Sequence, residues 1–347
     1  MANQKRMGKV FLLSAVVLSF LMGSSLGTVR AADPLLFHCG STSTPEHSWH
    51  RSFDIFMAEV EKNSNGSMKA LREFASQHGG ERQMVEACLR GELDVVVTSD
   101  IGIAAVFPPL GFTNLPYLFP DYPEVDKRYL NGWMGQAIAQ FLLNKSTGDK
   151  GIRVLAFGEN DFRAITNSRR PVKSAADLKG LKLRTPEIPM YVSFYKHLGV
   201  LPTPMAVPEI ATALQQKTVD GQENGAIITW AYGWSEFQKY ATKTKHIYSG
   251  MEILISKKKW DSLMPAQQKI VGEAAKKSAA AQVVMNRNDV ETFYGNMAKK
   301  GMEVIEATPQ LKQDMAEAAK KVWAEPKTTE TFGKETMDRI IKDVGGK

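Results

Sequence analysis

Short apolar runs alternate with stretches of helical periodicity along most of this 347-residue chain. Residues 35–39 form a strand-like run, and residues 49–60 carry apolar side chains at helical spacing. The order returns further on, where a helical stretch at 81–89, closed by Gly91, precedes a run of buried-type residues at 93–97. Strands separated by helices are typical of a parallel or mixed sheet covered by helices. The sequence therefore predicts an α/β fold.

The alternation continues well beyond the length of one domain, which favours two lobes with separate cores. No further proline follows Pro265 up to residue 300, which predicts a long helix, with a break near Gly272 or Gly295 left open. Residues after Pro309 predict two more amphipathic helices. Further strands are expected at 152–157, 162–166 and 181–184.

The first 32 residues have the composition of a secretory signal peptide. Lys5, Arg6 and Lys9 form a basic start, and the apolar run at 10–22 is too short to span a bilayer comfortably. Small residues follow, so we expect cleavage near Ala31 or Ala32 and a product exported to the periplasm. An uncleaved membrane anchor is the alternative.

The charge of the chain gives little support to nucleic-acid binding. The net charge is +7, but the predicted signal peptide carries four of the basic residues and no acidic one. No block of lysine and arginine interleaved with aromatic residues occurs elsewhere. Cys39 and Cys88 are the only cysteines, and an exported chain permits them to pair. We favour two small buried thiols, because a chain of this length can bury a sufficient core without a disulfide bond.

The sequence contains no pattern typical of an enzyme or of a cofactor site. It has no nucleophile elbow, phosphate-binding glycine loop, dinucleotide fingerprint or zinc pattern of paired Cys and His. His47 and His50 have a spacing that suits one helical face, but no carboxylate-rich partner lies nearby. We therefore assign no catalytic residue, no metal ligand and no cofactor.

Two arginines stand where a charge needs a partner. Arg163 lies inside an apolar, strand-like run, where a guanidinium must be paired or reach water. Arg184 ends a strand just before Pro186, and ligands of open α/β sheets bind at the carboxyl ends of strands. The stretch 219–225 reads as a short strand that enters a polar turn before another helix. Taken alone, however, an arginine at a strand end is more often part of a surface ion pair.

Short motifs follow one another in a fixed order through the mature chain. They are Phe162-Arg163 with Thr166-Asn167-Ser168, then 177–184, 202–205, 213–215 and 219–224, flanked by 77–81, 114–119 and 254–258. In this order the motifs resemble those of the solute-binding proteins of tripartite ATP-independent periplasmic (TRAP) transporters. The resemblance covers essentially all of the chain after residue 32.

The resemblance implies a periplasmic binding protein-like fold with two α/β lobes, a ligand cleft between them and a long connecting helix. Lobe I would comprise 33–160 plus 250–289, and lobe II would comprise 161–249 plus 290–347. It also implies that Arg184 forms a bidentate salt bridge with a ligand carboxylate, a geometry that suits the planar guanidinium. Arg163 and Asn224 would add contacts.

Other positions bear on the rest of the ligand. Glu81 aligns with a position that bonds ligand hydroxyls in the family, although an acid at a helix start also serves the helix dipole. Ser99 is a weaker candidate, and Val207 replaces a frequent aromatic side chain, which predicts a roomier wall. Asp161 stands where glycine is usual and Gly225 where proline is usual, and both Asp161 and Glu252 are candidates to receive hydroxyls or to be solvated or ion-paired.

We therefore expect a non-enzymatic, monomeric receptor. It would capture a small organic acid, either a sugar acid such as a uronate or aldonate or a C4-dicarboxylate, and deliver it to the integral membrane permease subunits of a TRAP transporter. An exported lyase or hydrolase acting on acidic sugars, with Glu81 or His47 as acid or base, is one alternative. A sensor with the same binding fold is another.

Overall fold

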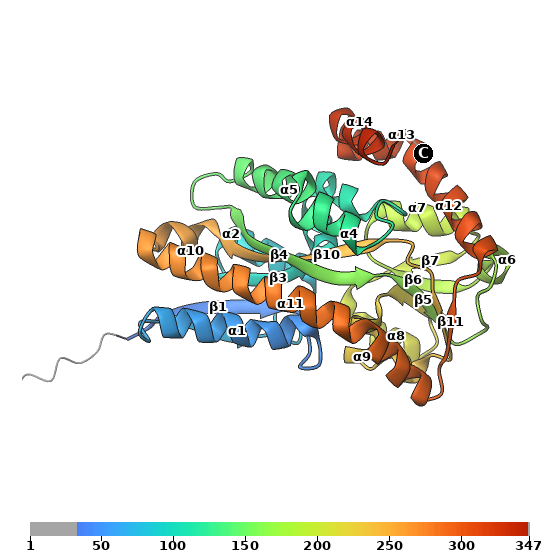
Figure 1. The fold of residues 1–347 in the computed structure, drawn as a ribbon, viewed down its shortest axis with the longest axis horizontal. Helices are drawn as coiled ribbons and strands as arrows, with labels where there is room; N and C mark the ends of the chain where they lie inside the picture. Colours follow the sequence, from blue (N-terminus) through green and yellow to red (C-terminus); the bar gives the residue numbers. More distant parts are fainter. Residues whose placement is uncertain (1–32, 346–347) are drawn as a thin grey trace, which may run out of the picture. The chain divides into compact units, whose positions relative to one another are not determined.

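The computed structural model describes residues 33–345, and its first sheet has five strands in the order β2-β1-β3-β10-β4 (Figure 1). β1 pairs in parallel with β2 and β3, whereas β10 is antiparallel to both β3 and β4. The three parallel strands come from the first hundred residues, but β10 arrives much later in the chain. The bounds are β1 Leu35–Ser41, β2 Met68–Glu73, β3 Val95–Ser99, β4 Ile152–Phe162 and β10 Tyr248–Ser256.

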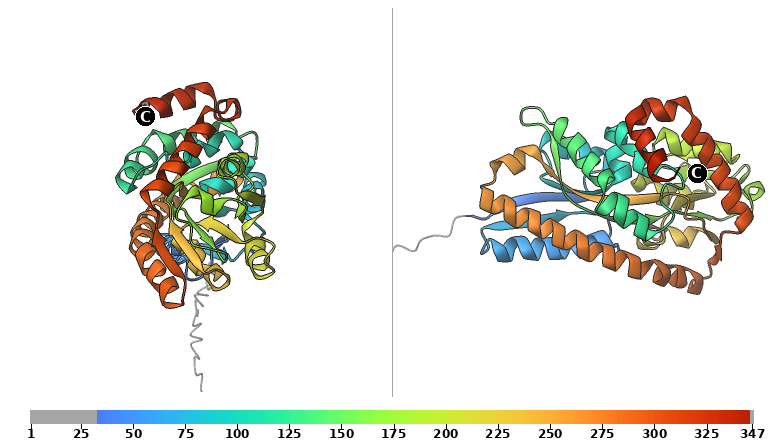
Figure 2. Two further views of the ribbon diagram at one scale, coloured as in Figure 1. Left: turned by 90° about the vertical axis from the view of Figure 1, so that its right-hand side faces the viewer. Right: turned by 45° about the horizontal axis from the view of Figure 1, so that its top comes forward.

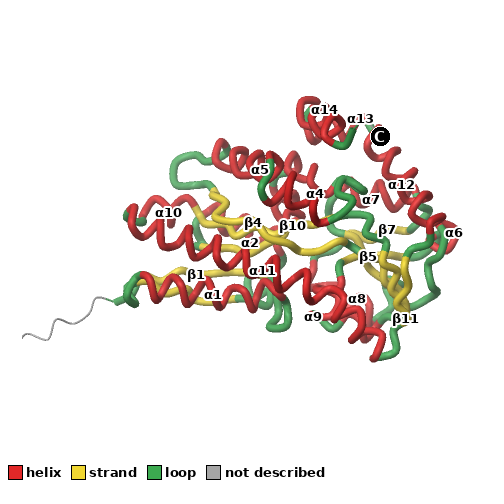
Figure 3. The backbone as a smooth tube through the Cα atoms, in the orientation of Figure 1, coloured by secondary structure: helices red, strands yellow, loops and turns green. Residues whose placement is uncertain are grey.

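The second sheet has six shorter strands in the order β11-β9-β5-β8-β6-β7. β6 is parallel to β7 and β8, and β5 is antiparallel to β8 and β9. Figure 3 shows the strands of both sheets flanked by helices, as the alternating pattern predicted. The bounds are β5 Ala164–Asn167, β6 Lys182–Thr185, β7 Leu201–Pro204, β8 Gly221–Asn224, β9 Tyr240–Lys243 and β11 Glu303–Glu306.

The chain passes between the two sheets at two neighbouring places. Arg163 alone separates β4 of the first sheet from β5 of the second, and the segment 244–247 returns the chain from β9 to β10. Arg163 N–H donates to the carbonyl oxygen of Ile247 at 2.8 Å, so the two crossing segments are hydrogen-bonded to each other. Two α/β sheets joined in this way confirm the predicted fold class.

A single helix, α11 (Pro265–Lys299), runs past both sheets (Figures 1 and 2). It packs on α1 and β4 of the first sheet and on α9 and β11 beside the second. At 1.5 Å per residue, 35 residues span about 50 Å. Neither Gly272 nor Gly295 interrupts it, and a Cβ at either position meets nothing within 4 Å.

The prediction of two helices after Pro309 is wrong, because this part forms three. Pro326 starts a new helix after α12, since proline lacks the N–H that a helix interior requires. Gly333, with φ of 84°, ends α13 before α14 begins. The three helices are α12 Pro309–Ala324, α13 Pro326–Phe332 and α14 Lys334–Asp343.

The remaining helices cover the sheets or join their strands. Ten of them have bounds α1 Ser48–Asn63, α2 Glu81–Arg90, α3 Asp100–Val106, α4 Tyr122–Val125, α5 Trp133–Asn144, α6 Ala175–Leu178, α7 Pro189–His197, α8 Ile210–Gln215, α9 Ala226–Ala231 and α10 Lys257–Ser262. Short irregular helical turns occupy Pro108–Asn114, Asp126–Leu130, Val207–Glu209 and Trp234–Phe237.

Cys39 and Cys88 are both buried and unpaired, so the favoured prediction of two free thiols agrees with the structure. Between residues 33 and 345, no helix is long and apolar enough to cross a membrane. The predicted signal peptide and its cleavage site lie outside the described residues.

Candidate ligand-binding site

A small cavity of about 40 Å³ lies where elements of both sheets meet. From the first sheet it is lined by the start of α2 and by α3, and from the second by the end of β6, the turn after it and the segment that follows β7. Three of the predicted site residues line this cavity: Glu81, Arg184 and Val207.

Arg184 is the charged group that distinguishes the cavity. It is the third residue of β6 and only 4% exposed, and its Nε and Nη2 groups donate to the carbonyl oxygen of Met205 at 3.0 and 2.7 Å. A guanidinium has five N–H donors, and these bonds use two of them. Among the described residues, no carboxylate lies within ion-pair distance of it. Burial lowers its pKa to about 10, although the carboxylates of Glu223 and Glu81 act in the opposite direction from beyond ion-pair distance.

Arg163 is also buried, but it has a full partner. Its Nε is 2.5 Å from Oε2 of Glu223, and its Nη2 is 2.7 Å from Oε1 and 2.7 Å from the carbonyl oxygen of the same residue. Although burial opposes the charge, Glu223 holds the pKa of Arg163 above its ordinary value. The guanidinium also lies 5.5 Å from the ring centre of Tyr191, within range of a cation–π contact. Arg163 does not line the cavity with Arg184.

Asn224 ends β8, next to β6, and its side chain is held by a chain of amides. Nδ2 of Asn224 donates to Oε1 of Gln222 at 2.6 Å. Nε2 of Gln222 in turn donates to hydroxyls of Thr166 and Thr229 at 2.8 and 3.1 Å, which fixes the orientation of both amides. In the β6–β8 register Arg184 pairs with Gln222, so Asn224 lies two residues further along the adjacent strand. Asn224 likewise does not line the cavity.

Glu81 and Ser99 are brought together, but they bond each other. The Glu81 carboxylate accepts from the N–H of Ser99 at 2.7 Å, from its hydroxyl at 2.8 Å and from the Thr98 hydroxyl at 3.2 Å. Oγ of Ser99 also accepts from the N–H of Gly102 and so caps α3. These bonds tie the start of α2 to the end of β3, and they hold the carboxylate of Glu81 at the cavity wall.

The two further carboxylates named from the sequence lie elsewhere. Glu252 is fully buried in β10 and accepts a hydrogen bond from the hydroxyl of Tyr129. Asp161 is buried at the end of β4 and accepts from backbone N–H groups and from Tyr122. Neither lines the cavity.

Two participants were missed by the sequence reasoning. The Met205 carbonyl that receives Arg184 is a backbone group, and no residue type signals it. Glu223 is different, because a carboxylate between Gln222 and Asn224 on a short buried strand already required a cation opposite it. Arg163 could have been identified as that cation once β5 and β8 were known to lie antiparallel to each other.

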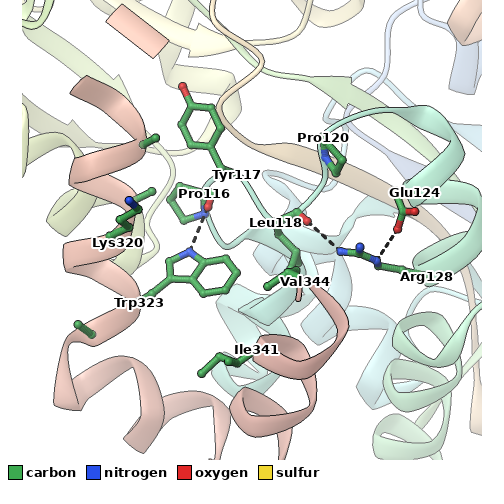
Figure 4. A pocket seen from close by; sticks show the side chains of 13 residues that line it. Pro116, Tyr117, Leu118, Pro120, Glu124, Arg128, Lys320, Trp323, Ile341 and Val344 are labelled. Carbon is green, nitrogen blue, oxygen red and sulfur yellow. Dashed lines mark hydrogen bonds and ion pairs between the residues drawn. The ribbon is translucent and has the colours of Figure 1, made fainter. Parts of the chain in front are cut away.

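A much larger hollow of about 670 Å³ lies away from these residues, between the segment 116–128 and helices α12 and α14 (Figure 4). Its walls are mostly apolar, and the Tyr117 hydroxyl in them is buried without a hydrogen-bond partner among the described residues, whereas Trp323 and Arg128 have partners. The indole Nε1 of Trp323 donates to the carbonyl oxygen of Pro116 at 3.0 Å, and Arg128 lies 2.6 Å from Glu124. Size alone does not make it the site, because the buried cation without a counter-ion belongs to the smaller cavity.

His47 lies at the start of α1, where its Nδ1 accepts from the N–H of Trp49 at 3.2 Å. Burial lowers its pKa to about 3, so the ring is neutral at ordinary pH. Within residues 33–345, no group of three or more His, Cys, Asp or Glu side chains is arranged to hold a metal ion.

Comparisons with known proteins show the family of the chain. Residues 39–329 match the model of the bacterial extracellular solute-binding proteins, family 7. A solute-binding protein of Verminephrobacter eiseniae is 36% identical over 74% of both chains. The 2,3-diketo-L-gulonate-binding periplasmic protein of Escherichia coli is 30% identical over 90% of this chain and 89% of its own length.

A solved structure shows the same fold. The TRAP periplasmic solute-binding protein of Polaromonas sp. JS666, bound to D-erythronate, superposes with a TM-score of 0.82 and 34% identity over 88% of this chain and 98% of its own. The chain therefore belongs to the family 7 bacterial extracellular solute-binding proteins, the solute-binding proteins of TRAP transporters.

Proposed function

We propose that this chain captures a monocarboxylic sugar acid, with Arg184 as the anchor of the carboxylate, and delivers it to the membrane permease of a TRAP transporter. The observation that carries the proposal is the buried Arg184 guanidinium, which has no carboxylate partner among the described residues and lines a cavity. An anionic ligand supplies the missing counter-charge, and a carboxylate matches the guanidinium with two parallel bonds.

A sugar acid suits the site better than a C4-dicarboxylate. The acids bound by the Escherichia coli and Polaromonas relatives each have one carboxylate and several other oxygen atoms. In this chain the second arginine, Arg163, already pairs with Glu223, and Glu81 places a negative charge at the cavity wall. A second ligand carboxylate would meet Glu81, and the other arginine that lines the cavity, Arg82, is exposed and pairs with Glu86, whereas a ligand hydroxyl group can donate to Glu81.

Binding requires the cavity to widen. A volume of about 40 Å³ holds roughly three water molecules, which is less than a four-carbon acid needs. The walls come from elements of two different sheets, so separation of the lobes opens the site and closure brings both walls onto the ligand. We take the lobes as 33–160 plus 250–289 and 161–249 plus 290–347.

The remaining parts of the proposal concern the cellular setting. Residues 1–32 act as a signal peptide that is cleaved near Ala31 or Ala32, and the mature chain is a periplasmic monomer. Arg163, Asn224, Ser99 and Val207 contribute to the site beside Arg184 and Glu81, either by contact or by positioning. The ligand leaves unchanged, since the chain acts as a receptor and carries out no reaction.

A thermal-shift screen of the mature chain tests this function. The panel contains D-erythronate, galactonate, L-gulonate, glucuronate, succinate and malate, because a ligand of the native state raises the melting temperature. We expect a sugar acid to give the largest rise. Titration of the best acid with Arg184→Lys should show affinity weaker by about ten- to a hundredfold, since one charge-assisted bond of the fork is lost.

The matched control is Arg90→Lys, because Arg90 is exposed and pairs with Glu92 far from the cavity. It should leave the affinity unchanged. A larger shift with succinate or malate than with any sugar acid would reject the ligand class. Unchanged affinity in Arg184→Lys would reject the anchor.

A further inference from the structure

The side chain of Asp161 occupies the space that is left by the absence of a side chain at Gly225. Asp161 is only 2% exposed and lies at the end of β4, two residues before Arg163. Its Oδ1 accepts from the N–H of Phe162 at 2.6 Å and from the Tyr122 hydroxyl at 3.2 Å, and its Oδ2 accepts from the N–H of Ala226 at 3.1 Å. The carboxylate thus joins the first sheet to the start of α9.

Gly225 occupies the position that normally caps a helix with its own side chain. It is the residue before α9, and having no side chain it makes no capping bond. The carboxylate of Asp161 provides the acceptor for the first helical N–H instead. Gly225 also makes room for it, because a Cβ at this position would lie 2.4 Å from Cβ and 2.6 Å from Oδ2 of Asp161.

The residue held by this arrangement is Asn224. Its strand is fixed on one side by pairing with Ala164 in β5, and the chain after it is fixed by the bond from Ala226 to Asp161. The Gly225 carbonyl between them accepts from the Thr229 hydroxyl at 2.8 Å. The backbone on both sides of Asn224 is therefore tied to neighbouring elements, and one of these ties crosses to β4 in the first sheet.

We propose that Asp161 is a positioning residue of the binding site: by capping α9 through the space that Gly225 leaves open, it holds Asn224 in place. Asn224 does not line the small cavity, but it lies two residues beyond the partner of Arg184 on the adjacent strand, where its amide reaches the ligand once the cavity widens. This inference rests on the proposed function, because it needs Asn224 to serve the bound acid. It explains jointly why an acid stands at 161 and a glycine at 225. A larger residue at 225 is compatible only with a smaller one at 161.

The test combines ligand affinity with a measurement that needs no ligand. Hydrogen exchange of the ligand-free mature chain is followed in a peptide that covers 224–228, for Asp161→Asn and Asp161→Ala. We expect exchange at the Ala226 amide to rise about tenfold in Asp161→Ala and less in Asp161→Asn, which keeps one acceptor oxygen. Asp177→Asn is the control, since it alters the cap of α6, a different short helix.

The steric part of the proposal is tested by exchanging the bulk between the two positions. Gly225→Ala should weaken binding of D-erythronate, or of the sugar acid that binds best, by about tenfold. The double variant Asp161→Gly/Gly225→Ala should recover the melting temperature lost in Gly225→Ala, because the added methyl group then has space, but not the affinity, because it also lacks the carboxylate that positions Asn224. A merely structural role predicts losses of affinity that follow the melting temperature, with exchange raised throughout the chain.

The outcomes separate the two ideas. Unchanged exchange at 224–226 in both Asp161 variants, or unchanged affinity of both variants for the sugar acid that binds best, overturns the positioning role. Unchanged affinity in Arg184→Lys together with raised exchange at 224–226 overturns the ligand function and leaves the Asp161 cap in place as a structural device, which also ends its role at the site.

Discussion

The guanidinium of Arg163 and the carboxylate of Glu223 form a bidentate ion pair between the crossing segment and β8, with both side chains almost fully buried. Burial alone would raise the pKa of Glu223, but Arg163 holds it below its ordinary value. The two charges stabilise each other where neither would be tolerated alone. Arg184, on the next strand, has no such partner among the described residues, and this contrast is why we propose Arg184 rather than Arg163 as the anchor of the ligand carboxylate.

The pair predicts a large loss of stability when one partner is neutralised. Glu223→Gln leaves the Arg163 charge buried without a counter-ion, so we expect the free energy of unfolding to fall by about 3 to 5 kcal/mol. Urea unfolding of the ligand-free chain measures it. Asp338→Asn, which removes an exposed partner of Lys334, serves as the control and should change it by no more than about 0.5 kcal/mol. Equal effects of the two variants would contradict the assignment.

From the raised pKa of Asp100 we expect the free energy of unfolding to fall as the pH rises. The carboxylate accepts from the side chains of Ser249, Thr113 and Asn114, yet burial raises its pKa from 3.8 to about 6. Because the folded state then binds more protons than the unfolded state, the free energy of unfolding decreases between about pH 4 and pH 6. Asp100→Asn should remove this decrease. A series of urea unfolding curves across that range checks it, and parallel pH profiles of the two proteins would contradict it.

From the lowered pKa of His47 we expect the opposite dependence, a free energy of unfolding that falls as the pH falls. Its pKa is lowered from 6.5 to about 3, mainly by burial, with smaller contributions from Arg51 and His50. The unfolded state therefore binds more protons between these values, and stability is lost as the pH falls. Between pH 6.5 and pH 5 the loss through His47 amounts to about 1.6 kcal/mol. His47→Asn, which keeps a residue suited to the start of a helix, should lose correspondingly less over the same range.

Because Gly102 is closely surrounded, we expect that a side chain at this position would disturb the cavity wall. A Cβ at this position would lie 2.3 Å from Oγ1 of Thr98 and 2.7 Å from Cβ of Glu81. Gly102→Ala should therefore displace Glu81 and weaken binding of a hydroxylated acid by about tenfold, as measured by calorimetric titration. Gly272→Ala is the matched control, because it lies in α11 with open space around it and should stabilise the chain by about 1 kcal/mol. Unchanged affinity of Gly102→Ala for the acid would contradict this prediction, because the position of Glu81 would then not affect binding.

Local patterns were enough to predict most elements and the position of Arg184. Pro186 predicts the end of the strand that carries Arg184, and the structure ends β6 at Thr185, directly before it. Long-range pairing was beyond such patterns. Nothing in the run 248–256 indicates that it lies antiparallel between β3 and β4, because its residues are buried on both faces and carry no alternation. The capping of α9 by Asp161 is of the same kind, since the two positions are distant in sequence.

The late arrival of β10 also determines when the chain can fold. The first sheet stays divided, with β4 separated from β3, until Ser256 of the 347 residues has been made. Contacts between such distant parts of a chain form slowly, because a long loop must close before they gain any stability. A chain that is still being made therefore lacks a complete first sheet until late in its synthesis, and the fully folded protein forms only after that point.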